Sequence, residues 1–228
     1  MTTRPLDRDD PLDDFDRRTI RLLGTDRLVY VTGGGPAVIV MTEMPGISPH
    51  VARFARWVRD AGFTVYMPHT LWLRALAALA HDECGGKGVG AIGMCFTGNF
   101  ALSMMLEPAV LAPVLAQPSL PLNDPAGMHI APDELAAVKA RMEAEDLTVL
   151  AYRFAGDKFC KAARFAAYED ALGERFVGRV LPDEAANPDS PMKNPHSVVT
   201  IHLIDEAGQP TVQARDEILD FFKMRLSD

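Results

Sequence analysis

The sequence is poor in cysteine. Its 228 residues include only three, and these are widely spaced. An odd number of cysteines at such spacing fits neither a disulfide framework nor a zinc site. We therefore expect a protein without a bound metal or a cofactor.

Long apolar segments are missing as well. No apolar run reaches the roughly 18 residues that a membrane-spanning helix needs. The first ten residues lack the apolar core of a secretory signal peptide. We expect a cytoplasmic protein that does not enter a membrane.

Positive charge is in deficit. The chain has 23 Lys and Arg residues against 31 Asp and Glu residues, which gives a net charge of -8. Such a surface does not attract the phosphate backbone of nucleic acids or anionic lipid headgroups. We expect a small-molecule partner rather than a nucleic acid or a membrane, and a monomer or a weak homodimer.

A phosphate-binding loop is also absent from the one glycine run. Gly33, Gly34 and Gly35 are followed by an apolar strand rather than a helix, and the spacing Gly-x-x-x-x-Gly-Lys-Ser/Thr does not occur. We interpret this run as a turn.

What the sequence does contain is an alternation of apolar strands and amphipathic helices. With 48% hydrophobic residues, the chain is long enough for one well-buried core. After a polar lead-in over residues 1–16, loose or lying on the surface, we expect one α/β domain over residues 17–228. It should be a mostly parallel, doubly wound sheet with helices on both faces. The predicted strands are 18–23, 27–32, 37–41, 63–68, 89–94, 109–117, 147–154 and 176–181, and the predicted helices are 49–61, 72–80, 100–106, 132–143, 161–172 and 216–226.

One segment, residues 89–100, carries the strongest chemical signal. A short strand leads through Gly93 to Cys95 at a turn, and a helix begins at Phe100. This is how a nucleophile elbow is built, and the helix dipole favours a thiolate there. Cys95 stands at the serine of the Gly-x-Ser-x-Gly pattern, and Thr97 occupies the place of the second glycine, which comes one residue late. The alternative is that Cys95 is a small buried hydrophobic residue.

Two later residues complete a candidate catalytic triad. Asp157 follows a predicted strand, and His196 follows a long polar loop. A thiol nucleophile needs a base, and the base needs an acid that fixes its tautomer. The order nucleophile, acid, histidine is that of α/β-hydrolases. Asp157 alone could instead be a turn or cap residue and His196 a solvated loop residue; His202, at a strand-like or core-edge position, is the second candidate for the base.

These segments resemble the dienelactone hydrolase family of α/β-hydrolases. The resemblance covers residues 37–226 and rests on Val38–Gly46 (VIVMTEMPG), Gly93–Gly98 (GMCFTG), Gly156-Asp157 and His196-Ser197. It implies the α/β-hydrolase fold, with Cys95 as nucleophile, His196 as general base and acid, and Asp157 as its partner.

The same resemblance implies roles for three further residues. Glu43 matches a glutamate that lies near the thiol and helps to govern its activation. The backbone N–H groups of Met44 and Phe96 would form the oxyanion hole, since one follows the nucleophile and the other lies in the loop after an earlier central strand. By itself, Glu43 is equally compatible with an ordinary loop carboxylate.

The sequence departs from the family in two places. The family's type enzyme binds a substrate carboxylate with arginines, one of them four residues after the histidine, where this sequence has Thr200. Dienelactone itself is therefore doubtful as the substrate. Relatives also carry a longer segment between the strand near Pro68 and the helix near Trp72. Either this protein lacks that lid, or a loop is missing from a continuously numbered chain, which the Cα distance between Leu71 and Trp72 would reveal.

We therefore predict a hydrolase that cleaves a carboxylic ester or lactone through a thiol acyl-enzyme. Two alternatives stay open. The chain is compatible with a non-catalytic α/β-hydrolase-fold module for binding or regulation. It is also compatible with a redox protein that uses Cys95 as a peroxidatic thiol, although no second cysteine lies at short spacing.

Overall fold

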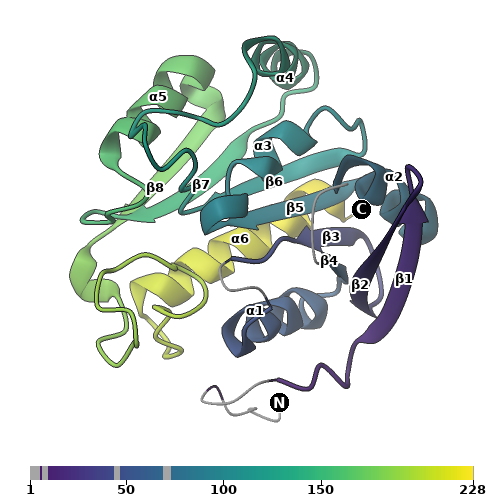
Figure 1. Cartoon of the computed structure of the whole chain (residues 1–228), viewed down its shortest axis with the longest axis horizontal. Coiled ribbons are helices and arrows are strands. Elements are labelled where there is room, and N and C mark those ends of the chain that lie inside the picture. Colours follow the sequence, from purple (N-terminus) through teal and green to yellow (C-terminus); the bar gives the residue numbers. More distant parts are fainter. Residues whose placement is uncertain (1–5, 7–9, 44–46, 69–72, 228) are drawn as a thin grey trace.

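An eight-stranded sheet forms the centre of the molecule (Figure 1). The computed structural model describes residue 6 and residues 10–43, 47–68 and 73–227. Within them the strand order is β1-β2-β4-β3-β5-β6-β7-β8. The strands are β1 (Asp16–Leu22), β2 (Thr25–Gly33), β3 (Ala37–Val40), β4 (Thr64–Pro68), β5 (Val89–Met94), β6 (Val110–Ala116), β7 (Val149–Phe154) and β8 (Phe176–Leu181).

The strand directions confirm the predicted fold class. The six strands from β3 to β8 run parallel to their neighbours among themselves, while β1 and β2 form an antiparallel hairpin that adds to β4. The carboxyl ends of β3, β5, β6, β7 and β8 therefore meet at one edge of the sheet, where open α/β sheets place their sites.

Helices cover both faces of this sheet. The helices are α1 (Pro49–Asp60), α2 (Leu73–Cys84), α3 (Phe100–Met104), α4 (Pro132–Ala144), α5 (Ala162–Leu172) and α6 (Pro210–Leu226). α1 and α6 pack on one face and α2 to α5 on the other (Figure 1). Along β3, Val38 and Val40 join the first layer and Ile39 the second. Burial on both sides explains why this strand is a continuous apolar run.

Local signals set the start of α1. The Oγ of Ser48 accepts a hydrogen bond from the N–H of Val51 (3.3 Å), and Pro49 takes the first turn of the helix. These residues form a regular cap, and the predicted start of this helix is confirmed.

The start of α6 is predicted less well. The helix begins at Pro210, whereas the sequence predicts a start at Asp216. The first turn of α6 buries Thr211 and Val212. Because one of these two buried residues is a polar threonine, the spacing of apolar residues typical of a helix is interrupted there, and the sequence does not predict this turn.

The described end of the lead-in lies against α1. Arg56 donates hydrogen bonds to Asp10 (2.6 Å) and Asp14 (2.7 Å), and its guanidinium lies 5.3 Å from the centre of the buried Phe15 ring. The hydrogen bond from Arg56 lowers the pKa of Asp14 below its usual range. This part of the lead-in therefore lies against the surface of α1, where ion pairs with Arg56 hold it.

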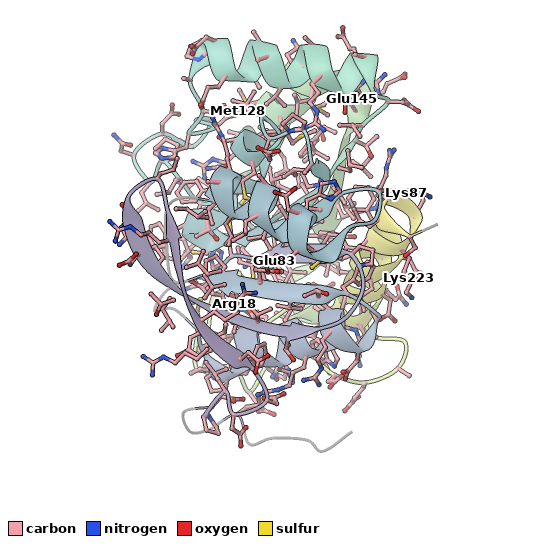
Figure 2. All side chains as sticks on the ribbon, turned by 90° about the vertical axis from the view of Figure 1, so that its right-hand side faces the viewer. Arg18, Glu83, Lys87, Met128, Glu145 and Lys223 are labelled. Atoms are coloured by element: carbon pink, nitrogen blue, oxygen red, sulfur yellow. The ribbon has the colours of Figure 1, made fainter. Side chains whose placement is uncertain are left out.

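The β1–β2 hairpin is joined to α2 by a charged pair. Arg18 donates two hydrogen bonds to the carboxylate of Glu83 (2.7 and 2.6 Å), and the two side chains lie side by side in Figure 2. The hydroxyl of Tyr66 on β4 donates to the same carboxylate. Because the pair is partly exposed, the strand ladder contributes most of the hairpin's stability.

One prediction of the sequence lies outside the described residues, namely the connection between Leu71 and Trp72. None of the helices in the described ranges is both long and apolar enough to span a membrane.

Replacing Phe222 with alanine should destabilise the protein strongly. Phe222 of α6 is fully buried and packs edge-on against Phe63, with 6.0 Å between ring centres. The variant should lose about 3–5 kcal/mol of unfolding free energy, measured by chemical denaturation. Met224 on the same helix is 65% exposed, so its alanine variant should change stability by no more than about 0.5 kcal/mol. Equal losses in the two variants would contradict this packing.

Candidate active site

Cys95 lies at the sharp turn that ends the central strand β5. Its φ of 55° is in the left-handed region, which is uncommon for a residue other than glycine. A 3-10 turn (Cys95–Thr97) and then α3 follow directly. This strand–turn–helix arrangement has the geometry predicted for the elbow, and it holds Cys95 at the carboxyl edge of the sheet with 9% of its surface exposed.

Two glycines make this turn possible. A Cβ on Gly93 would lie 2.1 Å from the carbonyl oxygen of Thr97, and a Cβ on Gly98 would lie 2.5 Å from the Cα of Pro118. The second glycine of the motif comes one residue late because position 98, not 97, faces the chain that leaves β6. The Oγ of Thr97 accepts a hydrogen bond from the N–H of Met94 (2.9 Å) and faces the carbonyl oxygen of Thr42 (2.9 Å).

Asp157 and His196 meet in the structure. The Nδ1–H of His196 donates to Oδ2 of Asp157 at 2.8 Å, and both side chains are buried. The other carboxylate oxygen of Asp157 accepts the backbone N–H groups of Phe159 (2.8 Å) and Cys160 (3.0 Å). The turn after β7 therefore fixes the carboxylate, and the carboxylate fixes the imidazole and its tautomer.

The second nitrogen of His196 is left without a partner. Its Nε2 is buried and has no hydrogen-bond partner within the described ranges. Burial lowers the pKa of His196, but the hydrogen bond to Asp157 and the interaction with Cys95 outweigh it, so that the pKa is raised to about 10. Cys95 is thus close enough to act on this imidazole, and Nε2 is the nitrogen free to exchange a proton.

Glu43 lies in a buried polar network beside the histidine. Its carboxylate accepts hydrogen bonds from the Oγ of Ser197 (2.8 Å), the hydroxyl of Thr200 and the side-chain amide of Gln117 (3.2 Å). Burial raises the pKa of Glu43, against the effect of these donors and of the nearby His196. The network ties the end of β3 to the turn that carries the histidine.

No protein-family model and no curated protein sequence matches the chain. Several solved structures resemble it over most of its length. A candidate dienelactone hydrolase from Klebsiella pneumoniae is 15% identical, with a TM-score of 0.64 over 90% of this chain and 98% of that one. An esterase from Pyrococcus furiosus is 11% identical, with a TM-score of 0.66 over 99% and 97%. A dienelactone hydrolase-like promiscuous phosphotriesterase from metagenomic libraries is 17% identical, with a TM-score of 0.62 over 94% and 100%.

The chain has the α/β-hydrolase fold. The resemblance to dienelactone hydrolases inferred from the sequence is thereby confirmed at the level of the fold, since solved structures of dienelactone hydrolase-like proteins and esterases superpose on nearly the whole chain. In this fold, Cys95, Asp157 and His196 occupy the loops after β5, β7 and β8 respectively.

Of the two predicted oxyanion donors, Phe96 and Met44, only Phe96 lies among the described residues. Phe96 follows Cys95 inside the 3-10 turn, so its N–H belongs to the start of that turn. Met44 lies outside the described residues. Within the described ranges no group of three or more His, Cys, Asp or Glu side chains is arranged to hold a metal ion.

Of the two positions that the neighbours of His202 predict, strand-like or core-edge, the structure shows the second. The residue lies in a turn rather than in a strand, and its buried ring packs edge-on against Phe154. Its Nδ1 accepts the backbone N–H groups of Ser197 (3.0 Å) and His196 (3.3 Å), and its Nε2 donates to the carbonyl oxygen of Met192 (2.8 Å). Burial lowers its pKa. Because both ring nitrogens are engaged, His202 holds the backbone of His196 and is not available as a base.

Four residues of this site are not predicted from the sequence. Ser197, Thr200 and Gln117 bind Glu43, and Arg164 holds the loop beside the candidate triad. The one usable signal is a polar residue, Gln117, directly after an apolar strand. The partners of the others come from distant segments and leave no local pattern.

Gly93 should not tolerate a side chain. Its alanine variant places Cβ against the backbone of Thr97, which cannot move without opening the turn, so it should lose about 1–3 kcal/mol of unfolding free energy. The matched control is Gly34→Ala, because a Cβ at Gly34 meets nothing within 4 Å. Denaturation curves of the two variants measure the difference, and equal stability would contradict the close approach at the turn.

The Asp157–His196 bond should make stability depend on pH. The pKa of His196 is raised from its ordinary 6.5 to about 10. Its contribution to stability is therefore complete below about pH 6.5 and is lost as the pH rises through about 10. The difference in unfolding free energy between wild type and Asp157→Asn should shrink between these two pH values.

The control for this pH dependence is Asp205→Asn, which removes a partly exposed carboxylate paired with Arg215. Its effect should be small and nearly constant over the same range. A constant difference for Asp157→Asn would contradict the raised pKa of His196.

Proposed function

We propose that the protein hydrolyses a carboxylic ester or lactone with Cys95 as the nucleophile. The observation that supports this most strongly is the buried 2.8 Å hydrogen bond between His196 and Asp157, which leaves Nε2 of the same imidazole unpartnered and within electrostatic reach of Cys95. A nucleophile, a base and an orienting acid are the minimum for covalent acyl transfer. The α/β-hydrolase fold and the hydrolase neighbours are consistent with this chemistry.

In this proposal His196 accepts the proton of the Cys95 thiol through Nε2. The raised pKa of His196 makes this nitrogen a strong proton acceptor. The imidazolium that forms is shielded from water because His196 is only 2% exposed. Asp157 stabilises the imidazolium without taking the proton itself.

Acylation begins with this proton transfer. The Cys95 thiolate attacks the carbonyl carbon, and the electrons of the C=O bond move to oxygen. The N–H groups of Phe96 and Met44 bind the resulting oxyanion. When the C–O bond to the alcohol breaks, Nε2–H of His196 protonates the leaving alkoxide, and the acyl group remains on sulfur as a thioester.

Deacylation requires the neutral imidazole. Cys95 helps to raise the pKa of His196, and that contribution disappears once the sulfur carries an acyl group. His196 then accepts a proton from water through Nε2 while the water oxygen attacks the thioester. Cleavage of the C–S bond releases the acid and restores the thiolate.

Glu43 acts in this proposal on the histidine rather than directly on the thiol. Its three hydrogen-bond donors include Ser197 and Thr200 on the turn that follows His196. The hydroxyl of Thr200 donates a hydrogen bond to the carboxylate of Glu43. Thr200 stands at the position where the type enzyme of the dienelactone hydrolase family has a substrate-binding arginine. Position 200 therefore offers no positive charge to a substrate carboxylate, which favours a neutral ester or lactone over dienelactone.

Replacing Cys95 should show how much of the ester hydrolysis depends on this thiol. Cys95→Ala should lower ester turnover by at least about 10³-fold, because the nucleophile is gone, while Cys95→Ser should retain a small fraction. A panel of p-nitrophenyl esters, lactones and thioesters measures the loss. The control is Cys84→Ser, since Cys84 lies at the end of α2. Undiminished hydrolysis by Cys95→Ala would contradict the assignment.

The alternative of a non-catalytic module is distinguished by thiol reactivity. An activated Cys95 should react with iodoacetamide near neutral pH faster than Cys84 and Cys160. Cys160 is fully buried, and burial raises the pKa of its thiol. Peptide mapping of the alkylated protein gives the three rates; a slow Cys95 together with absent turnover would favour the binding module.

A further inference from the structure

Phe159 is an apolar side chain that the fold leaves partly in water beside the triad. The ring is 46% exposed. It lies edge-to-face with the imidazole of His196, with 5.2 Å between ring centres and an angle of 66°. His196 itself is only 2% exposed, so Phe159 forms part of the cover over the imidazole.

The backbone of Phe159 is fixed on both sides by buried charged groups. Its N–H donates to Oδ1 of Asp157 (2.8 Å), and its carbonyl oxygen accepts from the guanidinium of Arg164 (3.1 Å). Asp157 is 4% and Arg164 is 1% exposed. The ring is therefore presented at a defined place relative to His196.

The guanidinium of Arg164, which holds the backbone of Phe159, is fully used in hydrogen bonds. Arg164 uses all five of its N–H donors on backbone carbonyl oxygens, which belong to Pro118, Pro121, Asp124, Gly127 and Phe159. Arg164 therefore has no N–H left for a charged group of the substrate, and what Phe159 itself offers is its exposed apolar ring.

The chemistry of the site says which part of the substrate meets the ring. His196 must protonate the leaving oxygen, so the alcohol portion of an ester lies next to the imidazole and hence next to Phe159. Covering the exposed ring with an apolar group removes both surfaces from water, which favours binding.

We propose that Phe159 is a specificity-determining residue that binds an apolar alcohol portion of the ester substrate. This inference rests on the proposed function. The protein should prefer esters of larger apolar alcohols, and Phe159 should have little influence on the acyl portion.

The experiment compares two substrate series on wild type and Phe159→Ala. One series keeps the acyl group and varies the alcohol (ethyl, butyl and benzyl acetate); the other keeps ethanol and varies the acyl group (ethyl acetate, butanoate and hexanoate). Phe159→Ala should lower kcat/KM for benzyl acetate about tenfold relative to ethyl acetate, mainly through KM, and should leave the ranking of the acyl series unchanged.

Two further variants show that the effect belongs to the apolar ring. Phe159→Leu should recover part of the preference, and Val180→Ala, which truncates another exposed apolar side chain (52%) on β8, should have no effect. The pH profile for ethyl acetate should be the same in wild type and Phe159→Ala, because the ring contacts substrate and does not set the protonation of His196. An equal loss on all esters, a shifted pH profile or an altered acyl ranking would overturn the inference.

A second readout keeps this inference separate from the proposed function. Iodoacetamide and its N-phenyl derivative alkylate Cys95 without ester turnover. Phe159→Ala should slow only the phenyl reagent. If wild type shows no Cys95-dependent hydrolysis, the proposed function fails while the ratio of the two alkylation rates still tests the apolar contact; an unchanged ratio overturns it.

Discussion

The site depends on one buried contact, the hydrogen bond between His196 and Asp157. It joins the turn after β7 to the long loop after β8, two segments that no strand pairing connects at that point. Because both groups are shielded from water, the carboxylate acts on the imidazole with little screening and overcomes the effect of burial on its pKa. The orientation of Nε2, and with it the relation to Cys95, follows from this bond.

Two buried side chains, His202 and Glu43, hold the turn that carries His196 in place. His202 accepts the backbone N–H groups of His196 and Ser197, which sets the path of the turn, and Glu43 receives the hydroxyl of Ser197 a short distance away. Both supports are buried polar groups with their hydrogen bonds satisfied, an arrangement that specifies one geometry. The loop after β8 has little regular structure, so its path is fixed by these side-chain hydrogen bonds rather than by the backbone hydrogen bonds of a helix or strand.

The sequence predicts the fold well, because strands buried on both faces and helices with one apolar face leave strong periodic signals. The contact between Asp157 and His196 at the edge that carries Cys95 is also predictable: the three residues each follow a strand, and parallel strands bring their carboxyl ends together. The start of α6 and the role of His202 as a hydrogen-bond acceptor could not be predicted, since a buried threonine and a buried histidine look polar in sequence. The partners of Glu43 were missed because each comes from a remote segment and acts through a single hydroxyl or amide.

Arg164 has a consequence for how this scaffold can be changed. The loop between β6 and α4 lacks regular structure along its length, and four of its carbonyl oxygens converge on one guanidinium from α5. The conformation of this loop thus depends on hydrogen bonds to a residue outside the loop. A redesigned loop would therefore need α5, with its arginine, to be kept or changed together with it, even though α4 and β7 separate the two along the chain.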